Sequence, residues 1–429
     1  MTVSQPLTIL APEEIEAIHQ ATLRILHEVG VVLTHPQSRE ILTTAGARVS
    51  GERLRLPPDL VEAQLVQCPH TVTLRGRDGK GITLGDGSLH WHNLGGARDV
   101  FEPSTGQLRP ASLQDVRDSN RLLDALPRVS AVTPFFTPVG VPGGVMSLAM
   151  YRHSLPYTTK PVHGPGVQTA AEVAYLARMA AVIGPPSDLL SLGISPLSPL
   201  TFPDDIAAAI LETARLGIPL GPLPCPTAGA TAPLSLAGAL AQQNAEVLAM
   251  VVLAQLVRPG LPVFYCGRLA MLEPRLGSSV WGGAELGLAS AATVQIGHRY
   301  GLPVNVYGFS TNAFDLGLQD GYERALNAVV PALAGADELS GIGEMAAGVM
   351  GSYAQIVVDD EIAGGVQRLR GGIVVDEDSL AVEVIAKVMD ASRNFLGEAH
   401  TRRYLRAGEI FITRLAERGG WQNWLQGSR

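Results

Sequence analysis

The stretch Gly217-Ile218-Pro219-Leu220-Gly221-Pro222-Leu223 decides the fold, because its pattern follows a helical run and recurs twice. Gly260-Leu261-Pro262 precedes the apolar run 263–266, and Gly301-Leu302-Pro303 precedes the apolar run 304–307. Glycine suits the left-handed residue that ends a helix, and a continuously apolar run is typical of a strand covered on both faces. The spacing of roughly 40 residues therefore predicts successive βαβ units joined by right-handed crossovers.

Five further apolar stretches are predicted strands: 89–93, 129–136, 161–164, 189–194 and 338–342. With the three above they make eight, the number expected for a (β/α)8 TIM barrel of the α/β class, and an open doubly wound sheet is the alternative. No GxGxxG follows the first strand and no GxxxxGK[ST] occurs, which disfavours nucleotide-binding folds. We expect an N-terminal α+β cap over residues 1–85, and the barrel with a C-terminal helical tail over 86–429.

Composition narrows the function classes. The 429 residues are 46% hydrophobic and 17% charged, which indicates a large buried core. The net charge of −8 and the lack of a basic stripe argue against nucleic acid as a partner. Three scattered cysteines fit a reducing cytoplasm, and the N-terminus lacks a signal-peptide pattern. The apolar run 234–257 is interrupted by Gln242, Gln243, Asn244, Glu246 and Gln255, so no membrane span is expected.

Chemistry in a barrel lies at the carboxyl ends of the strands, and this rule selects candidate residues. The strongest is Glu344, which stands in the glycine-rich, apolar stretch 341–345, where a solvated surface role is a weak explanation. Arg268 follows a strand at the end suited to binding an anion, with a surface ion pair as the alternative. His90 and His92 have the alternate spacing of a metal site, but no third ligand is apparent, so a pocket wall or packed core is favoured and no metal is expected. Asp359, Asp360 and Glu361 are predicted to mark a helix start.

Three blocks of sequence resemble the trimethylamine:corrinoid methyltransferase family. They are Thr227-Ala228-Gly229-Ala230-Thr231-Ala232-Pro233 with its continuation to Glu246, then Gln319-Asp320-Gly321-Tyr322-Glu323, and finally Gly335-Ala336-Asp337 through Ile362. The resemblance covers nearly the whole chain and implies a (β/α) barrel. It also implies transfer of a methyl group from a methylated amine to the cobalt of a corrinoid, or cobalamin, carried by a separate protein.

The founding members of that family hold pyrrolysine shortly before the Gln-x-Gly-Tyr-Glu block. Counting back without gaps places Phe314 at that position. The chain is therefore similar to the non-pyrrolysine branch, whose characterised members demethylate quaternary amines such as glycine betaine.

A quaternary ammonium has no lone pair and no N–H, so it is recognised by aromatic faces, each contributing about 0.5 to 2 kcal/mol. The departing amine is neutral, so the reaction needs alignment and no general acid. The expected substrate site has Arg268 for a carboxylate tail and His92 as a further wall. Its aromatic cage would draw on Trp91, Phe135, Tyr265, Tyr307, Phe314 and Tyr353. Glu344 and Phe314 are the expected catalytic residues, and contact with the corrinoid is expected from Thr227, Gly229, Ser310 and Thr311.

Two other functions remain open at this point. One is a different barrel enzyme, such as a lyase with Glu344 and His92 as an acid/base pair. The other is a protein that binds quaternary amines or corrinoid without turnover. In each case we expect a homo-oligomer, because Trp421 and Trp424 near the C-terminus suggest an anchoring patch on another subunit.

Overall fold

The computed structural model describes residues 6–164, 166–391, 393–422 and 425. Its central strands are parallel and short. Followed from β6, the parallel pairings lead to residues 131–132, β9, β10, β12, residues 263–265, β16 and β17, and β17 pairs in turn with β6. These strands are β6 His90–Asn93, β9 Val162–Gly164, β10 Leu190–Ile194, β12 Leu220–Pro222, β16 Asn305–Tyr307 and β17 Glu338–Ile342.

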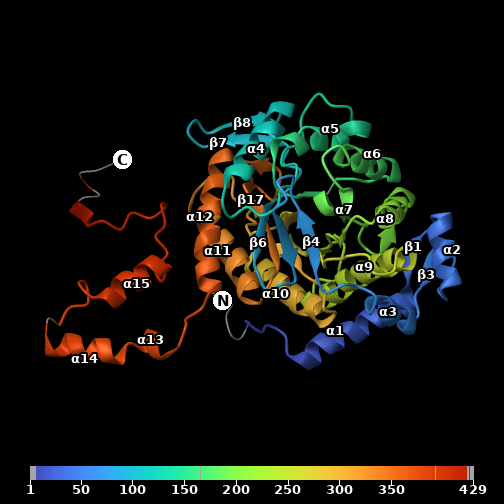
Figure 1. The fold of residues 1–429 in the computed structure, drawn as a ribbon. Coiled ribbons are helices and arrows are strands. Elements are labelled where there is room, and N and C mark those ends of the chain that lie inside the picture. The colour runs from blue at the N-terminus through green and yellow to red at the C-terminus, as the bar shows by residue number, and fades with distance from the viewer. Residues whose placement is uncertain (1–5, 165, 392, 423–424, 426–429) are drawn as a thin grey trace.

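Helices cover the outside of these strands (Figure 1). The three glycine-proline joints each lie between a helix and a strand segment, as the sequence predicts, and Gly217 ends α8 in the left-handed conformation. The helices of this layer are α4 Leu113–Ala125, α5 Met146–Arg152, α6 Ala170–Ala180, α7 Pro186–Leu189, α8 Asp204–Leu216, α9 Leu236–Val257, α10 Ala284–Arg299, α11 Leu318–Leu333 and α12 Tyr353–Arg370.

The helix α9 is buried around almost its whole circumference. By length and composition it could cross a membrane, but 83% of its apolar window is buried inside the protein, as in the core helix of a globular protein. Asn244 on α9 donates to the hydroxyls of Thr22 and Tyr300 and accepts from Tyr265, so a buried polar network ties α9 to its neighbours. Helices α8 and α10 contact this helix, as do three helices of the N-terminal segment.

The N-terminal segment packs on the same helix. It comprises α1 Pro12–Arg24, a π-helical turn Ile25–Val29, α2 Pro36–Thr44 and α3 Pro58–Leu65, with strands β1 Val31–Leu33, β2 Arg48–Ser50 and β3 Arg53–Arg55. α1, α2 and α3 all contact α9. The hairpin of β4 Val72–Arg75 and β5 Gly81–Leu84 shares an apolar cluster with Phe264.

Loops at the carboxyl ends of the strands form small additional sheets. They are β7 Asp99–Glu102, β8 Gln107–Pro110, β11 Thr201–Phe202, β13 Thr227–Ala228, β14 Ala270–Glu273, β15 Ser278–Val280, β18 Glu344–Met345 and β19 Met350–Gly351. The hairpin of β18 and β19 follows β17 directly and pairs with β7. It therefore places Glu344 just beyond the carboxyl end of β17.

Two expectations differ from the structure. The predicted strands 129–136 and 263–266 appear only as isolated bridges, because proline and irregular backbone interrupt the ladders. The acidic cluster Asp359–Glu361 does not start a helix but lies in the middle of α12, where Asp359 and Asp360 pair with buried or half-buried arginines. Trp421 is exposed, and Trp424 lies outside the described residues.

The chain after α12 extends away from the helices and strands described so far, which we call the body. It forms α13 Glu377–Leu380, α14 Val382–Asp390 and α15 Ala399–Ala407, and Figure 1 shows these helices projecting from α12 on the side away from α6 and α8. The segment beyond α15 returns to α12, where Phe411 packs near Gly365 and Arg128. We call residues 372–391 and 393–415 the arm.

Replacing a buried leucine of α9 tests its central role. Leu248 is fully buried, so Leu248→Ala should lower the free energy of unfolding by about 2–5 kcal/mol through lost burial and the cavity left behind. Chemical denaturation measures this change. Leu318→Ala, at an exposed position, should change the free energy by less than about 0.5 kcal/mol; equal effects of the two substitutions would contradict the prediction.

Candidate functional site

A polar network fills the space enclosed by the central strands. His163 lies between Ser191 Oγ and Glu338 Oε1, at 2.5 Å from its Nδ1 and 2.7 Å from its Nε2. Asn305 Nδ2 donates to Glu338 Oε2 at 2.5 Å and to His92 Nε2 at 2.9 Å. Alternate residues of a strand face the same side, which explains why one side chain from each strand meets here. We call these five residues the interior network.

Hydrogen bonds fix the charges of the interior network. Because Asn305 donates to His92 Nε2, the proton of that imidazole lies on Nδ1, which donates to the Asn93 carbonyl at 2.7 Å. Burial lowers the pKa of His92 to about 4, so the ring is neutral at pH 7. For Glu338, burial alone would raise the pKa, but the adjacent His163 and the hydrogen bonds from His163 and Asn305 outweigh it and lower the pKa. Every member therefore has a partner.

A small cavity of about 40 Å³ adjoins the interior network. It is close to the volume of one or two water molecules in the liquid. Its walls include Phe264, Cys266 and Arg268 in addition to members of the network. Burial raises the pKa of the Cys266 thiol to about 12, so this sulfur is not a thiolate and not a ready nucleophile.

Arg268 connects this cavity to an aromatic pair. The buried guanidinium donates to the backbone carbonyl of Asn305 at 2.7 Å and to its side-chain oxygen, and it lies 5.0 Å from the centre of the Tyr307 ring. Trp281 packs against Tyr307 with ring centres 4.9 Å apart. Within the described residues no carboxylate lies at ion-pair distance from Arg268, so its charge is available to an anionic group.

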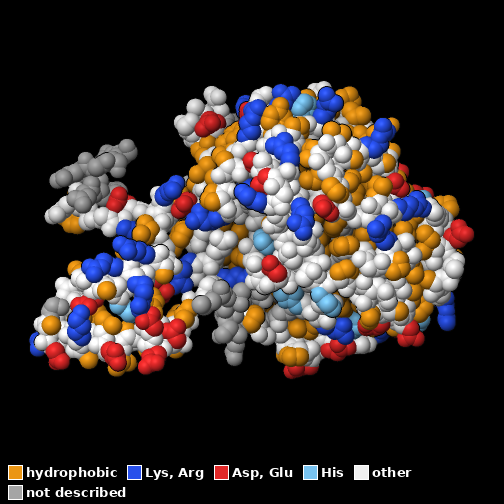
Figure 2. Space-filling model, viewed as in Figure 1, with side chains coloured by type: hydrophobic (Ala, Val, Ile, Leu, Met, Phe, Trp, Pro, Cys, Tyr) orange, Lys and Arg blue, Asp and Glu red, His pale blue; other side chains and the backbone are white. Residues whose placement is uncertain are grey.

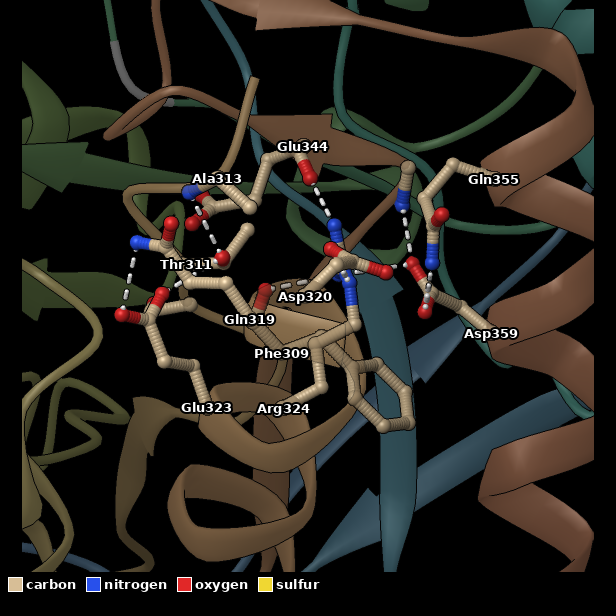
Figure 3. Close-up of polar contacts among 12 residues, drawn as sticks. Phe309, Thr311, Ala313, Gln319, Asp320, Glu323, Arg324, Glu344, Gln355 and Asp359 are labelled. Atoms are coloured by element: carbon tan, nitrogen blue, oxygen red, sulfur yellow. Dashed lines mark hydrogen bonds and ion pairs between the residues drawn. The ribbon is translucent and has the colours of Figure 1, made fainter. Parts of the chain in front are cut away.

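A second buried arginine organises the end of β17 (Figure 3). Arg324 on α11 donates to Asp320 at 2.6 Å and to Asp359 of α12 at 3.0 Å. It also donates to the backbone carbonyls of Phe309 and Glu344. Asp359 accepts from the Gly343 N–H at 2.7 Å. Residues 309, 343 and 344 are thus held by one guanidinium and its carboxylate.

Glu344 is the exception among these buried groups. Its side chain is fully buried, and neither carboxylate oxygen has a hydrogen-bond partner in the described part of the chain. In Figure 3 it extends toward the Thr311–Ala313 segment; the Ser310 hydroxyl and the Thr311 N–H lie near it and lower its pKa, although neither contact has full hydrogen-bond geometry. Burial raises its pKa to about 8, while the charge of Arg324 acts in the opposite direction. Buried polar groups without a partner are rare and point to an absent ligand or a functional task.

Glu344 also belongs to the same neighbourhood as Tyr307. Burial raises the pKa of the Tyr307 phenol, and the charge of Glu344 raises it further, whereas Arg268 lowers it. The turn after Glu344 has three successive left-handed residues, Ala346, Ala347 and Gly348. Two of these are alanines, which adopt this conformation only at some energetic cost. Trp281 lies close to Gly348 and so covers the turn.

Several predicted cage residues do not join this group. Trp91 is fully buried and stacks on Phe309 at 4.8 Å, and Phe135 is fully buried against Phe136. The hydroxyl of Tyr265 donates to Asn244 on α9, so this side chain points toward the helices. Tyr353 donates to Asp115 on α4 at 2.9 Å. Of the predicted aromatic residues in the described chain, only Tyr307 has its ring beside the Arg268 guanidinium, and the charge of Glu344 also acts on its phenol.

The remaining predicted site residues are divided between surface and interior. Phe314 is 71% exposed on the loop after β16, and Gly229 is exposed next to Thr227 at the start of the first family block. Ser310 and Thr311 are fully buried, and the Thr311 hydroxyl donates to Glu323 at 2.7 Å. Phe314, Gly229 and Thr227 can therefore contact a second protein directly, whereas the buried Ser310 and Thr311 cannot in this conformation.

Two alternatives lose support from the geometry. His92 is neutral and bonded to Asn305, and no hydrogen bond joins it to Glu344 in the described chain, so the proposed lyase pair is not assembled. For residues 6–164, 166–391, 393–422 and 425, no group of three or more His, Cys, Asp or Glu side chains could hold a metal ion. His90 and His92 therefore have no further ligands around them.

The rule that selects strand carboxyl ends also picks out His163, but sequence patterns missed Trp281, Arg324, Glu338 and Asn305. Trp281 lies in a loop without a distinctive motif, and only its aromatic character could have suggested it. Arg324 follows the second family block directly, and its spacing of four from Asp320 is a recognisable helical ion pair.

The role of Arg324 is testable by its removal. Arg324→Met leaves Asp359 buried without its partner, so the free energy of unfolding should fall by about 3–5 kcal/mol. Adding Asp359→Asn should recover part of that loss. The exposed pair of Arg275 and Glu273 is the control, since Arg275→Met should change the free energy by less than about 1 kcal/mol. A loss no larger than this control would refute the assigned role.

Comparisons with known proteins identify the family of this chain. The sequence model of the family described as trimethylamine methyltransferase (MTTB) matches residues 2–428. Trimethylamine methyltransferase MttB of Desulfitobacterium hafniense is 32% identical over 422 residues, covering 96% of this chain and 84% of that protein. Glycine betaine methyltransferase of Desulfitobacterium hafniense is 30% identical, covering 97% of this chain and 88% of that protein.

Among solved structures, the Methanosarcina barkeri monomethylamine methyltransferase MtmB is similar in fold, with a TM-score of 0.54 and 13% identity over 89% of this chain and 84% of that one. A structure of the hydroxylamine complex of MtmB gives a TM-score of 0.58 with 12% identity, covering 89% of this chain and 80% of that one. The protein thus has the mixed α/β fold of these methyltransferases, and its chain belongs to the trimethylamine methyltransferase family.

Proposed function

We propose that this protein transfers a methyl group from a quaternary amine, such as a betaine, to the corrinoid of a separate protein. Family membership supports the reaction class, since relatives at 30% and 32% identity are named as methyltransferases of glycine betaine and of trimethylamine. The observation that carries the choice of a cation is Glu344, a buried carboxylate without a partner near Tyr307 and Arg268.

The architecture in this proposal is a closed (β/α)8 barrel. The parallel pairings that run from β6 through the other strands and back to β6 support closure. Arg268, Tyr307 and Glu344 would then lie where barrel enzymes carry their chemistry, at the carboxyl ends of the strands. Residues 1–85 would act as a cap and 86–429 as the barrel with its helical tail.

Each side chain of the site has a separate task in this proposal. Tyr307 and Trp281 present ring faces to the quaternary nitrogen, which cannot accept or donate a hydrogen bond. Glu344 in its charged form neutralises the ammonium, and Arg268 binds the carboxylate at the other end of a betaine. The two opposite charges of such a substrate are thereby matched by the two available charges of the site.

The chemistry requires little more than orientation. The corrinoid supplies the reduced cobalt nucleophile that receives the methyl group. The amine leaves as a neutral molecule, so the protein supplies no proton and Glu344 is not an acid catalyst in this step. Holding nitrogen and methyl carbon in line with the acceptor can contribute on the order of 7 kcal/mol. Phe314, Thr227 and Gly229 are the proposed contacts of the corrinoid protein.

Substrate entry requires a conformational change. Glu344 and Tyr307 are buried in this conformation, and Trp281 lies close to Gly348 in the turn that follows Glu344. We infer that Trp281 and this turn move apart to admit the amine. The left-handed alanines of the turn are a plausible source of the energy difference between the two conformations, because their strain is released when the turn changes.

A spectroscopic assay tests the reaction. The purified protein is mixed with reduced cobalamin and a panel that includes glycine betaine, other betaines and trimethylamine. A quaternary amine should produce the methylcobalamin absorption spectrum. If methylcobalamin forms only with trimethylamine, the substrate is a tertiary amine and not a quaternary one. If no amine reacts, with either free cobalamin or a corrinoid protein as the acceptor, the proposal is refuted.

Glu344 predicts a specific pH dependence. Its pKa of about 8 means that the carboxyl is mainly protonated at pH 7, whereas a cation binds its ionised form. The affinity for glycine betaine should therefore rise about tenfold per pH unit up to about pH 8 and then level off. Calorimetry should also detect proton release on binding at pH 7.

Glu344→Gln removes the titrating group and is the matched test. The pH dependence should disappear, and KM should rise more than kcat falls, because the carboxylate stabilises the bound cation more than the neutral product. Glu40→Gln, at an exposed position on α2, should retain the wild-type profile. An unchanged pH profile in Glu344→Gln would assign the binding of the cation to other residues.

A further inference from the structure

The arm presents an apolar surface that the rest of its own chain does not cover. On α14, Val382, Ile385 and Met389 are spaced as one helical stripe, and all three are exposed. Only Val388 of this helix is buried. Further exposed apolar side chains of the arm are Ile373, Val375, Leu380, Phe395, Leu396, Leu405, Ile410 and Ile412. Contiguous exposed apolar surface of this kind marks an interaction site.

The helices of the arm are nevertheless held together by specific contacts. Asp378 of α13 accepts hydrogen bonds from Arg403 and Tyr404 of α15, and Lys387 of α14 pairs with Glu398 at 2.8 Å. Arg368 at the end of α12 pairs with Glu409 at 3.0 Å. The arm is therefore a defined structural element with a free face.

The arm as a whole is nearly balanced in charge, but unpaired acidic side chains lie beside the apolar stripe of α14. Asp376 and Glu377 precede α14, and Glu383 and Asp390 lie on it next to the apolar residues. Within the described chain, none of these four carboxylates makes an ion pair with an arginine or lysine. In Figure 2, acidic side chains follow the edge of α13 and α14.

A groove lined by basic side chains, opposite in charge to the acidic residues beside the α14 stripe, lies on the body between α5 and α6. Two adjoining cavities of about 520 and 420 Å³ share Arg152, Met179 and Val182, so they form one continuous groove. Its apolar lining includes Val145, Leu148, Tyr175 and the 87% exposed Val182. We call it the α5–α6 groove.

The α5–α6 groove is basic as well as apolar. Its walls carry Arg117, Arg152 and Arg178 and no carboxylate. None of these arginines pairs with an acidic side chain of residues 6–164, 166–391, 393–422 or 425. Figure 2 shows basic and apolar side chains together over this part of the body. An apolar ridge flanked by acids complements an apolar groove flanked by arginines.

We propose that the α14 stripe of one molecule docks in the α5–α6 groove of a second copy of this chain. In Figure 1 the arm projects from one side of the body and α5 and α6 lie on the other, so a molecule does not reach its own groove. The contact joins two different surfaces and is therefore heterologous, which produces a ring if the rotation between copies closes.

Charge reversal tests the contact on the full-length protein. The wild-type mass by light scattering should be a whole multiple of 45.2 kDa. Glu383→Arg with Asp390→Arg on the arm, or Arg152→Glu with Arg178→Glu in the groove, should each raise the dissociation constant on the order of tenfold or more. Combining all four substitutions should restore assembly, because the charges are again complementary. Val66→Asp, at an exposed position away from both surfaces, is the control.

A cysteine pair tests the register of the contact directly. In a Cys225→Ser background, Ile385→Cys with Val182→Cys should form a disulfide between two chains on mild oxidation, whereas Ile385→Cys with Val66→Cys should not. A monomeric wild-type protein, assembly that survives both charge reversals, or failure of the fourfold variant to recover would each overturn the proposal. Assembly that occurs only with a corrinoid protein would assign the arm to that partner and would also overturn it.

Discussion

The buried guanidinium of Arg324 is the interaction on which the site depends. It joins α11 and α12 through Asp320 and Asp359, and it holds the backbone carbonyls of Phe309 and Glu344 at the ends of two neighbouring strand segments. An arginine can do this because its planar fork has five donors and stays charged when buried. With its backbone fixed in this way, Glu344 keeps its carboxylate in an enclosed place where no protein group satisfies it.

The enclosed polar groups fall into two layers with different properties. In the interior network, Glu338, His163, Asn305 and His92 satisfy one another, so this layer is structurally complete. Beside this network, Arg268 has no carboxylate at ion-pair distance in the described chain, and Glu344 is a buried carboxyl group whose ionised form a bound cation would stabilise. In the proposed function, a zwitterion with a cationic head and an anionic tail supplies a partner for each of these two groups.

The repeated glycine-proline joints predict the order of helices and strands, because each joint combines a helix end with an apolar run that has few other structural options. The site was less predictable. Glu344 could be predicted from the sequence, because a carboxylate among glycines and apolar residues is poorly explained by a solvent-exposed position. The aromatic cage residues could not be predicted, because Trp91 and Tyr265 differ from Tyr307 only in the direction in which the strand register points the side chain. Asp359 was assigned to a helix start, but its pairing with Arg324 depends on contacts that are distant in sequence.

A crystal structure of the protein with glycine betaine tests the central claim most directly. The account predicts the quaternary nitrogen within about 6 Å of the Tyr307 and Trp281 ring centres, next to the Glu344 carboxylate, with the substrate carboxylate on Arg268 and Trp281 displaced from the 346–348 turn. One methyl group should face the open end of the site. Betaine bound at a place remote from Glu344, or a saturated crystal in which the enclosed site remains unchanged and empty of amine, would contradict it.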